Sequence, residues 1–243
     1  MDIWAIALLA VASLLSGLVQ SSLGFGYGIV FLALAGPFMG AFEVSIIAAL
    51  SAMVLNASIV WRMRSHVHFS GLWHISIATV VAVPLGVRFL QHGDESVFQL
   101  LIGLIIVFTL LQGRIAGLSK YRWHRVYAGL PVGVLSGVLA GAYGTGGPPA
   151  VAFVYSWRLP RLATVATIQY LLLVGAVPRT VVLFQQGLLQ SRLLPAAMCM
   201  VMCMIGSLIG MRILDKMPER LFRQLLNAFL AIVAVWYLSR WAF

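Results

Sequence analysis

Long apolar runs, interrupted by short polar or glycine-rich breaks, fill almost the whole chain. The runs at 75–87, 100–111 and 196–213 hold at most one charged residue each. A helix needs about 20 mostly apolar residues to cross a bilayer. The pattern therefore predicts an all-α, polytopic helical membrane protein rather than a soluble domain.

The breaks divide the chain into ten helical segments in two groups of five. The first group is 3–20, 26–39, 42–61, 72–91 and 96–112, and the second is 126–142, 148–157, 162–185, 192–214 and 219–240. A basic stretch separates the groups. We therefore expect a first membrane repeat at 1–113, a cytoplasmic basic linker at 114–125 and a second membrane repeat at 126–243.

The two groups share sequence blocks in the same order. Three glycines of the first half recur at one constant offset in the second: Gly17, Gly24 and Gly26 match Gly137, Gly144 and Gly146. Further on, "PLGVRFL" at 84–90 resembles "LIGMRIL" at 208–214, and "VFQLL" at 97–101 resembles "LFRQL" at 221–225. Ordered matches of this kind predict an internal duplication.

Composition agrees with the membrane assignment. The chain is 62% hydrophobic and 9% charged, whereas a soluble domain carries about 25% charged residues. The net charge of +10 would suggest nucleic acid in a soluble protein, but membrane proteins collect Lys and Arg in cytoplasmic loops. We expect the lipid bilayer as partner and no nucleic acid. The first apolar run has no Lys or Arg before it, so we expect a helix there rather than a signal peptide.

The positions of Lys and Arg predict the topology. If every segment changes sides, or if the first two of each half form a hairpin, all but four of the sixteen Lys and Arg share the side of the central linker. The four exceptions are Arg88, Arg179, Arg192 and Arg240. If the short second segments do not change sides, the distribution is nearly even. The positive-inside rule favours the first arrangement. Five segments per half then make the repeats inverted, with both termini outside.

Two glycine clusters interrupt the apolar pattern: "LGFGYG" at 23–28 and "YGTGGPP" at 143–149. Glycine permits unusual backbone dihedrals, and Pro148 and Pro149 suit a first helical turn. Each cluster therefore predicts a break ahead of a short helix. Irregular backbone inside a bilayer is tolerated where it lines a cavity, and free N–H groups at a helix start favour anions. Alternatively, the glycines only permit close helix packing.

The candidate substrate-binding residues lie at these clusters and on the segments beside them. Those at the clusters are Gln20, Ser22, Gly24, Gly26, Tyr27, Tyr143, Gly144, Thr145, Gly146 and Gly147, and those within segments are Asn56, Gln169 and Arg179. Arg179 lies about 9 Å from the end of its segment. It either binds an anion with its guanidinium fork or extends to the membrane surface. Asn56 and Gln169 either contact the substrate or bridge helices.

The sequence gives little support for a site of acid, base or metal chemistry. The carboxylates all lie near segment ends, so no mid-span proton relay is expected. Cys199 and Cys203 share one helix face and are expected to pack. The sequence contains no His-x-x-x-His and no Gly-x-Ser-x-Gly motif. We expect no catalytic residue, metal or cofactor. A membrane enzyme and a non-transporting scaffold are the alternatives to a transporter.

The paired glycine motifs, the basic central loop and the length resemble the sulfite exporter (TauE/SafE) family, also called the toluene-sulfonate uptake permease family. The resemblance covers almost the whole chain. It implies transport of small sulfur-containing anions, such as sulfite or organosulfonates, across the bacterial inner membrane, and the predicted topology then places both termini in the periplasm. Tyr27 stands where the second half has Gly147, so the motifs are not equivalent. A homodimer is compatible with the sequence.

Overall fold

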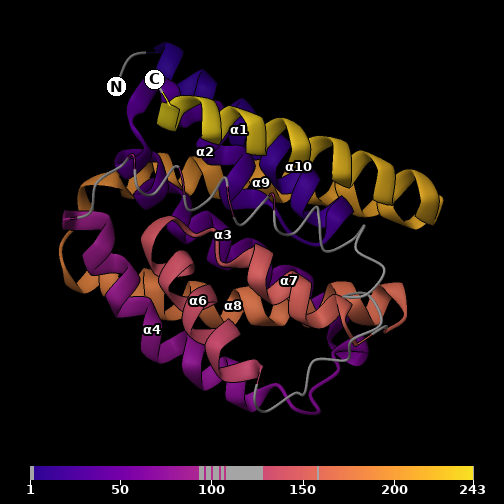
Figure 1. The fold of residues 1–243 in the computed structure, drawn as a ribbon. Helices are drawn as coiled ribbons and strands as arrows, with labels where there is room; N and C mark the ends of the chain where they lie inside the picture. Colours follow the sequence, from indigo (N-terminus) through magenta and orange to yellow (C-terminus); the bar gives the residue numbers. More distant parts are fainter. Residues whose placement is uncertain are drawn as a thin grey trace.

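The computed structural model describes residues 3–92, 128–157 and 159–242, together with the single positions 96, 100, 104 and 107. Within these residues the regular elements are all helices (Figure 1). They are α1 (Ile3–Leu23), α2 (Tyr27–Met39), α3 (Ala41–Met63), η1 (Arg64–His66), α4 (Trp73–His92), α6 (Gly129–Tyr143), α7 (Gly147–Tyr155), α8 (Arg161–Gln185), η3 (Gln190–Arg192), α9 (Leu193–Lys216) and α10 (Glu219–Ala242). The predicted linker, and most of the predicted segment 96–112, lie outside the described residues.

Among the described residues, five helical spans are long and apolar enough to cross a membrane: α1, α3 with η1, α4, α8, and η3 with α9. The polytopic helical prediction is therefore confirmed. By contrast, α2 has 13 residues and α7 has 9, which correspond to about 20 Å and 14 Å of helix. Neither reaches across a hydrocarbon core of about 30 Å. These lengths leave the hairpin version and the version in which the short segments do not change sides, so the topology stays a prediction.

Glycines bring two pairs of helices into backbone contact: α1 with α9, and α4 with α6. A Cβ atom on Gly206 of α9 would overlap the carbonyl oxygen of Leu14 in α1. A Cβ atom on Gly133 of α6 would lie 2.6 Å from the carbonyl oxygen of Ile75 in α4. Small residues at a helix interface permit this close approach. Gly17 and Gly137 have the same packing role, because a Cβ atom on either would overlap a backbone carbonyl oxygen of the facing helix.

Each close pair joins one helix from each half of the sequence. The first helix of one half packs on the fourth helix of the other, which is the arrangement expected of halves related by a twofold axis. The helices consequently form two structural units. We call α1, α2, α3 and α9 the first unit, and α4, α6, α7 and α8 the second unit; the main contact between them is α3 against α8. Figure 1 shows α1, α2 and α9 above α3, with the second unit below it.

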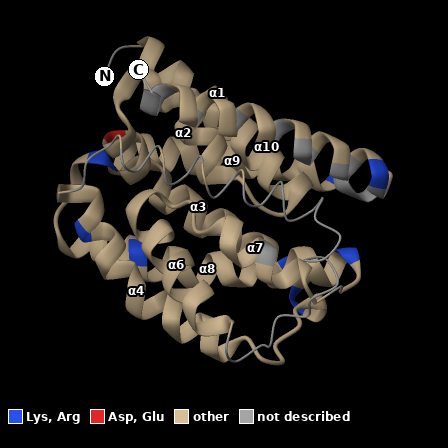
Figure 2. Cartoon of the chain, in the orientation of Figure 1, with Lys and Arg blue, Asp and Glu red and all other residues tan. Residues whose placement is uncertain are grey.

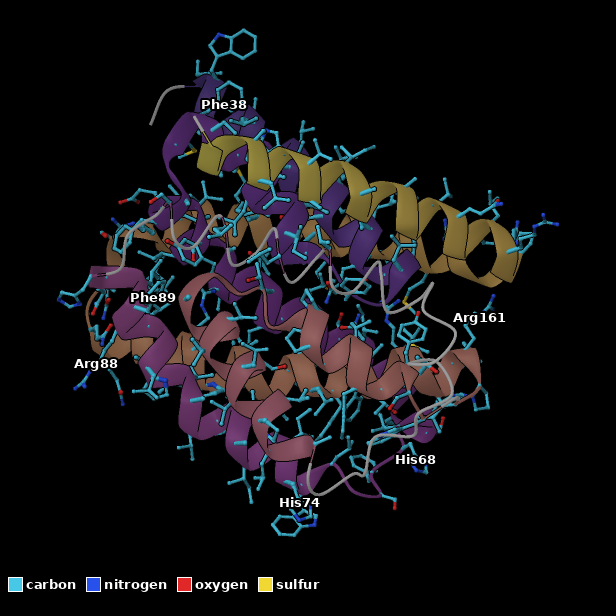
Figure 3. All side chains as sticks on the ribbon, in the orientation of Figure 1. Phe38, His68, His74, Arg88, Phe89 and Arg161 are labelled. Atoms are coloured by element: carbon cyan, nitrogen blue, oxygen red, sulfur yellow. The ribbon has the colours of Figure 1, made fainter. Side chains whose placement is uncertain are left out.

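Polar contacts at the helix ends agree with the predicted sides of the membrane. Arg192, next to the start of α9, forms an ion pair with Glu43 near the start of α3, with 2.6 Å between Nε and Oε2. At the opposite end, Arg161 Nη1 donates to the Met217 carbonyl at 3.2 Å. Arg88 and Arg161 lie at opposite ends of the bundle (Figure 3), and Lys and Arg lie mostly at the helix ends (Figure 2). The inverted orientation of the halves stays a prediction.

Candidate functional site

Both glycine clusters break the helix where the sequence predicts. The α1 helix ends at Leu23 and α2 begins at Tyr27, while α6 ends at Tyr143 and α7 begins at Gly147. The two three-residue breaks occupy equivalent positions in the halves. Positive φ angles occur at Gly24 (85°), Gly26 (118°) and Gly144 (70°), a conformation that favours glycine.

The two breaks lie against each other. A Cβ atom on Gly28 would stand 2.6 Å from the carbonyl oxygen of Gly144, and one on Gly147 would stand 3.5 Å from the Phe25 ring. We call α1 and α2 with the break between them the first hairpin, and α6 and α7 with their break the second. Gly28 and Phe25 belong to the first hairpin, whereas Gly144 and Gly147 belong to the second. The buried turns of the two hairpins therefore meet inside the bundle.

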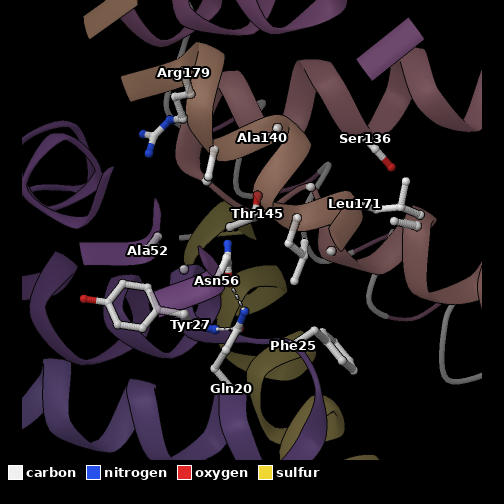
Figure 4. Close-up of a pocket in the computed structure, with 18 of the residues that line it drawn as sticks. Gln20, Phe25, Tyr27, Ala52, Asn56, Ser136, Ala140, Thr145, Leu171 and Arg179 are labelled. Carbon is white, nitrogen blue, oxygen red and sulfur yellow. Dashed lines mark hydrogen bonds between the residues drawn. The ribbon is translucent and has the colours of Figure 1, made fainter. Parts of the chain in front are cut away.

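A cavity of about 40 Å³ lies where the breaks meet. Residues of both structural units line it, and its volume exceeds the minimum for one water molecule. Nine candidate residues line the cavity: Gln20, Gly26, Tyr27, Asn56, Gly144, Thr145, Gly146, Gly147 and Arg179. Figure 4 shows Arg179 and Gln20 at opposite ends of the group. The lining also includes Phe25, Thr79 and Ser136, which the sequence did not suggest.

Four candidate residues do not line the cavity: Ser22, Gly24, Tyr143 and Gln169. Ser22 Oγ donates to the carbonyl oxygens of Leu18 at 2.7 Å and Gly210 at 3.2 Å, so it strengthens the α1–α9 contact. Gln169 Nε2 donates to the Gly24 carbonyl at 3.0 Å. Gly24 and Gln169 thus bond to each other behind the first break, and their direct contact with a substrate stays a prediction. Tyr143 is buried but does not line the cavity.

Arg179 is buried, with 2% of its surface exposed. Its Nε donates to the Gly141 carbonyl at 3.1 Å, and its Nη2 donates to the Ser45 carbonyl at 3.0 Å and to Ser45 Oγ. These bonds hold the guanidinium inside the bundle, so the alternative in which Arg179 extends to the membrane surface is wrong. In the described part of the chain, no carboxylate pairs with it. Its Nη1 lies beside Gly144 and has no hydrogen-bond partner among the described residues.

Polar side chains from two helices connect at the other end of the cavity. Gln20 Nε2 donates to Asn56 Oδ1 at 2.7 Å, and Gln20 Oε1 accepts from the backbone N–H of Tyr27 at 2.8 Å (Figure 4). The Tyr27 side chain points away from this group, and its hydroxyl is 2.9 Å from Ser13 Oγ. Tyr27 therefore borders the cavity without presenting its hydroxyl to it.

Several buried donors around the cavity lack partners within the described residues. The hydroxyls of Thr145 and Ser136 are two of them. Three backbone amides that start the short helices also have no partner there: Gly28, Ile29 and Gly147. The expected backbone donors at Gly24 and Gly144 are, by contrast, occupied by carbonyls of their own helices. Pro148 and Pro149 carry no N–H, so the second break offers fewer donors than its position suggests.

A sequence model of the family described as "Sulfite exporter TauE/SafE" matches residues 9–237. The chain belongs to this family. TauE/SafE proteins are membrane transporters, which agrees with the multi-pass bundle and its buried, donor-lined cavity. No curated protein and no solved structure gives a significant match to the chain.

Proposed function

We propose that this TauE/SafE protein exports small sulfur-containing anions, such as sulfite or organosulfonates, across the bacterial inner membrane. The anion binds in the cavity between the two helix breaks. One observation carries the proposal: Arg179 brings a buried positive charge to this cavity, and no carboxylate among the described residues neutralises it.

The buried charge of Arg179 has an energetic cost. A buried ion without a partner costs several kcal/mol of desolvation free energy. The unpaired donors at the cavity favour a ligand rich in hydrogen-bond acceptors. These donors are Arg179 Nη1, the hydroxyls of Thr145 and Ser136, and the unpartnered backbone amides. A small oxyanion supplies both the negative charge and the acceptors, and charge-assisted hydrogen bonds of this kind are the strong ones.

Alternating access follows from the arrangement of the helices. The cavity lies between the first and the second structural unit, and α3 against α8 forms their main contact. A change of angle at this contact would open the cavity to one side and close it to the other. The close pairs α1–α9 and α4–α6 remain intact in this motion because each lies within one unit.

The membrane potential drives export without a coupled ion. In a cell whose interior is negative by 100 mV, each negative charge that leaves gains about 2.3 kcal/mol, and a divalent anion gains about twice that. Facilitated export therefore suffices for a charged substrate.

The test is a flux assay on the purified protein in liposomes. Sulfite-loaded vesicles should release sulfite only when they contain the protein, and faster when the potential favours outward movement. Sulfate, thiosulfate, sulfoacetate and taurine in competition would define the substrate range. Absence of flux for every one of these anions would contradict the proposal. It would favour the membrane-enzyme or the scaffold alternative instead.

A further inference from the structure

Three carboxamides meet next to the cavity, on three different helices. Gln20 belongs to α1, Asn56 to α3 and Gln169 to α8. All three are buried. Each carboxamide has one acceptor end and one donor end, so its function depends on which end faces the cavity.

The neighbours of Gln20 fix its orientation. The backbone N–H of Tyr27 can only donate, and it lies 2.8 Å from Gln20 Oε1. The Gln20 NH₂ group must therefore face the other way, where it donates to Asn56 Oδ1 at 2.7 Å and Gln169 Oε1 at 3.2 Å. Every hydrogen-bonding group of this side chain is then used within the protein.

Gln169 is fixed in the same manner from the opposite side. A backbone carbonyl can only accept, and Gln169 Nε2 lies 3.0 Å from the carbonyl oxygen of Gly24 and 3.5 Å from that of Gln20. Gln169 must therefore present its oxygen to Gln20. The two anchors, Tyr27 N–H and Gly24 C=O, both belong to the first break.

These two fixed orientations leave Asn56 with a free donor. Its oxygen is occupied by Gln20, and its NH₂ group has no partner among the described residues although the side chain is 4% exposed and lines the cavity. Figure 4 shows Asn56 between Gln20 and Thr145. Of the three carboxamides, Asn56 is thus the one whose NH₂ group is left for a ligand in the cavity.

We propose that Gln20 and Gln169 are positioning residues that lock the Asn56 carboxamide with its NH₂ group toward the cavity. The site then holds its ligand by a guanidinium at one end and a fixed amide donor at the other. This deepens the proposed function and rests on it. An anion with several bare oxygens, such as an SO₃ group, accepts from Arg179 and Asn56 at once, and Gln20 itself does not touch it.

A double-mutant cycle separates a positioning role from direct contact. The variants are Gln20→Met, Asn56→Leu and their combination, with sulfite and sulfate affinities measured by calorimetry on the purified protein. Each single variant should weaken binding about 10- to 100-fold, the range for one hydrogen bond to a charged group. The double variant should bind no more weakly than Asn56→Leu alone, because an absent donor cannot be misoriented. Ser16→Ala, one turn earlier on α1, should bind as the wild type does, because the Ser16 hydroxyl donates to the Ala12 carbonyl of its own helix.

Additive losses in the double variant would overturn the inference, because they would mean that Gln20 acts on the anion independently of Asn56. Unchanged affinity in Gln20→Met would overturn it as well. If Gln20→Met does not fold, Gln169→Met in the same cycle tests the same lock, with the same two outcomes. A wild-type protein that binds neither anion would instead contradict the proposed function, so the two failures are distinguishable.

Discussion

The α-carbon of Gly28 faces the carbonyl oxygen of Gly144, and a Cβ atom on Gly28 would lie only 2.6 Å from that oxygen. These two residues belong to different hairpins and different halves of the chain. Their contact is what brings the two helix breaks to one cavity. Gly28 has no room to gain a side chain without moving the opposite break, and a Cβ atom on Gly144 would lie 3.1 Å from Arg179 Nη1.

The first prediction concerns this contact. Gly28→Ala should separate the two breaks and reduce anion flux at least tenfold, and overpacking should lower the free energy of unfolding by about 1–3 kcal/mol. Gly36→Ala is the matched control, since it lies on the same helix with no atom near its added methyl group. Flux in liposomes and thermal unfolding measure the two effects. Equal behaviour of the two variants would show that the breaks do not need this contact.

The second prediction concerns the buried charge. Arg179→Met should abolish flux while the protein still folds, because replacing an unpaired buried ion by an apolar side chain removes a desolvation cost. Arg179→Lys should restore only part of the activity, since an ammonium group lacks the guanidinium fork. Arg88→Met, at an exposed position on α4, is the control. Full flux in Arg179→Met would exclude this residue from substrate binding.

The third prediction asks which parts move. In a background with both native cysteines replaced by alanine, a disulfide between Ser21→Cys and Ser207→Cys should leave flux intact, because α1 and α9 form one unit and the two hydroxyls lie 2.7 Å apart. A disulfide between Ala49→Cys and Thr180→Cys should stop flux, because it joins α3 to α8 across the units. Reduction should restore it. Loss of flux with both disulfides would mean that the sequence halves themselves are the moving bodies, because each disulfide joins one half to the other.

The fourth prediction tests the inverted orientation of the halves. In the same background, Phe38→Cys and Gln186→Cys should react with a membrane-impermeant thiol reagent added to intact cells. Ser65→Cys and Lys216→Cys should react only after the membrane is opened. Labelling of Gln186→Cys on the same side as Ser65→Cys would contradict the proposed topology and make the repeats parallel.

The sequence predicted the helix breaks because their causes are local. Glycine and proline alter the backbone wherever they stand, so "LGFGYG" and "YGTGGPP" mark the breaks within a residue or two. The same holds for the long apolar helices, whose signal is the composition of one segment.

The direction of a side chain was less predictable, because it depends on distant partners. Ser22 and Tyr27 stand next to the first break, yet one bonds toward α9 and the other toward Ser13. Ser136 lies in an ordinary helical stretch of α6 and carries no local signal of a site. Arg179 could be identified as unusual, but its burial follows from carbonyls on α3 and α6 that sequence spacing does not reveal.

The exchange of helices between the halves also constrains biosynthesis. Ser13 and the carbonyl it contacts in α9 are 186 positions apart, which takes a ribosome roughly 10–40 s at 5–20 residues per second. During that delay the face of α1 that packs against α9 lacks its partner helix. Neither half, expressed by itself, would contain the partner of its own first helix, so an early-terminated chain should be recognised and degraded by membrane proteases.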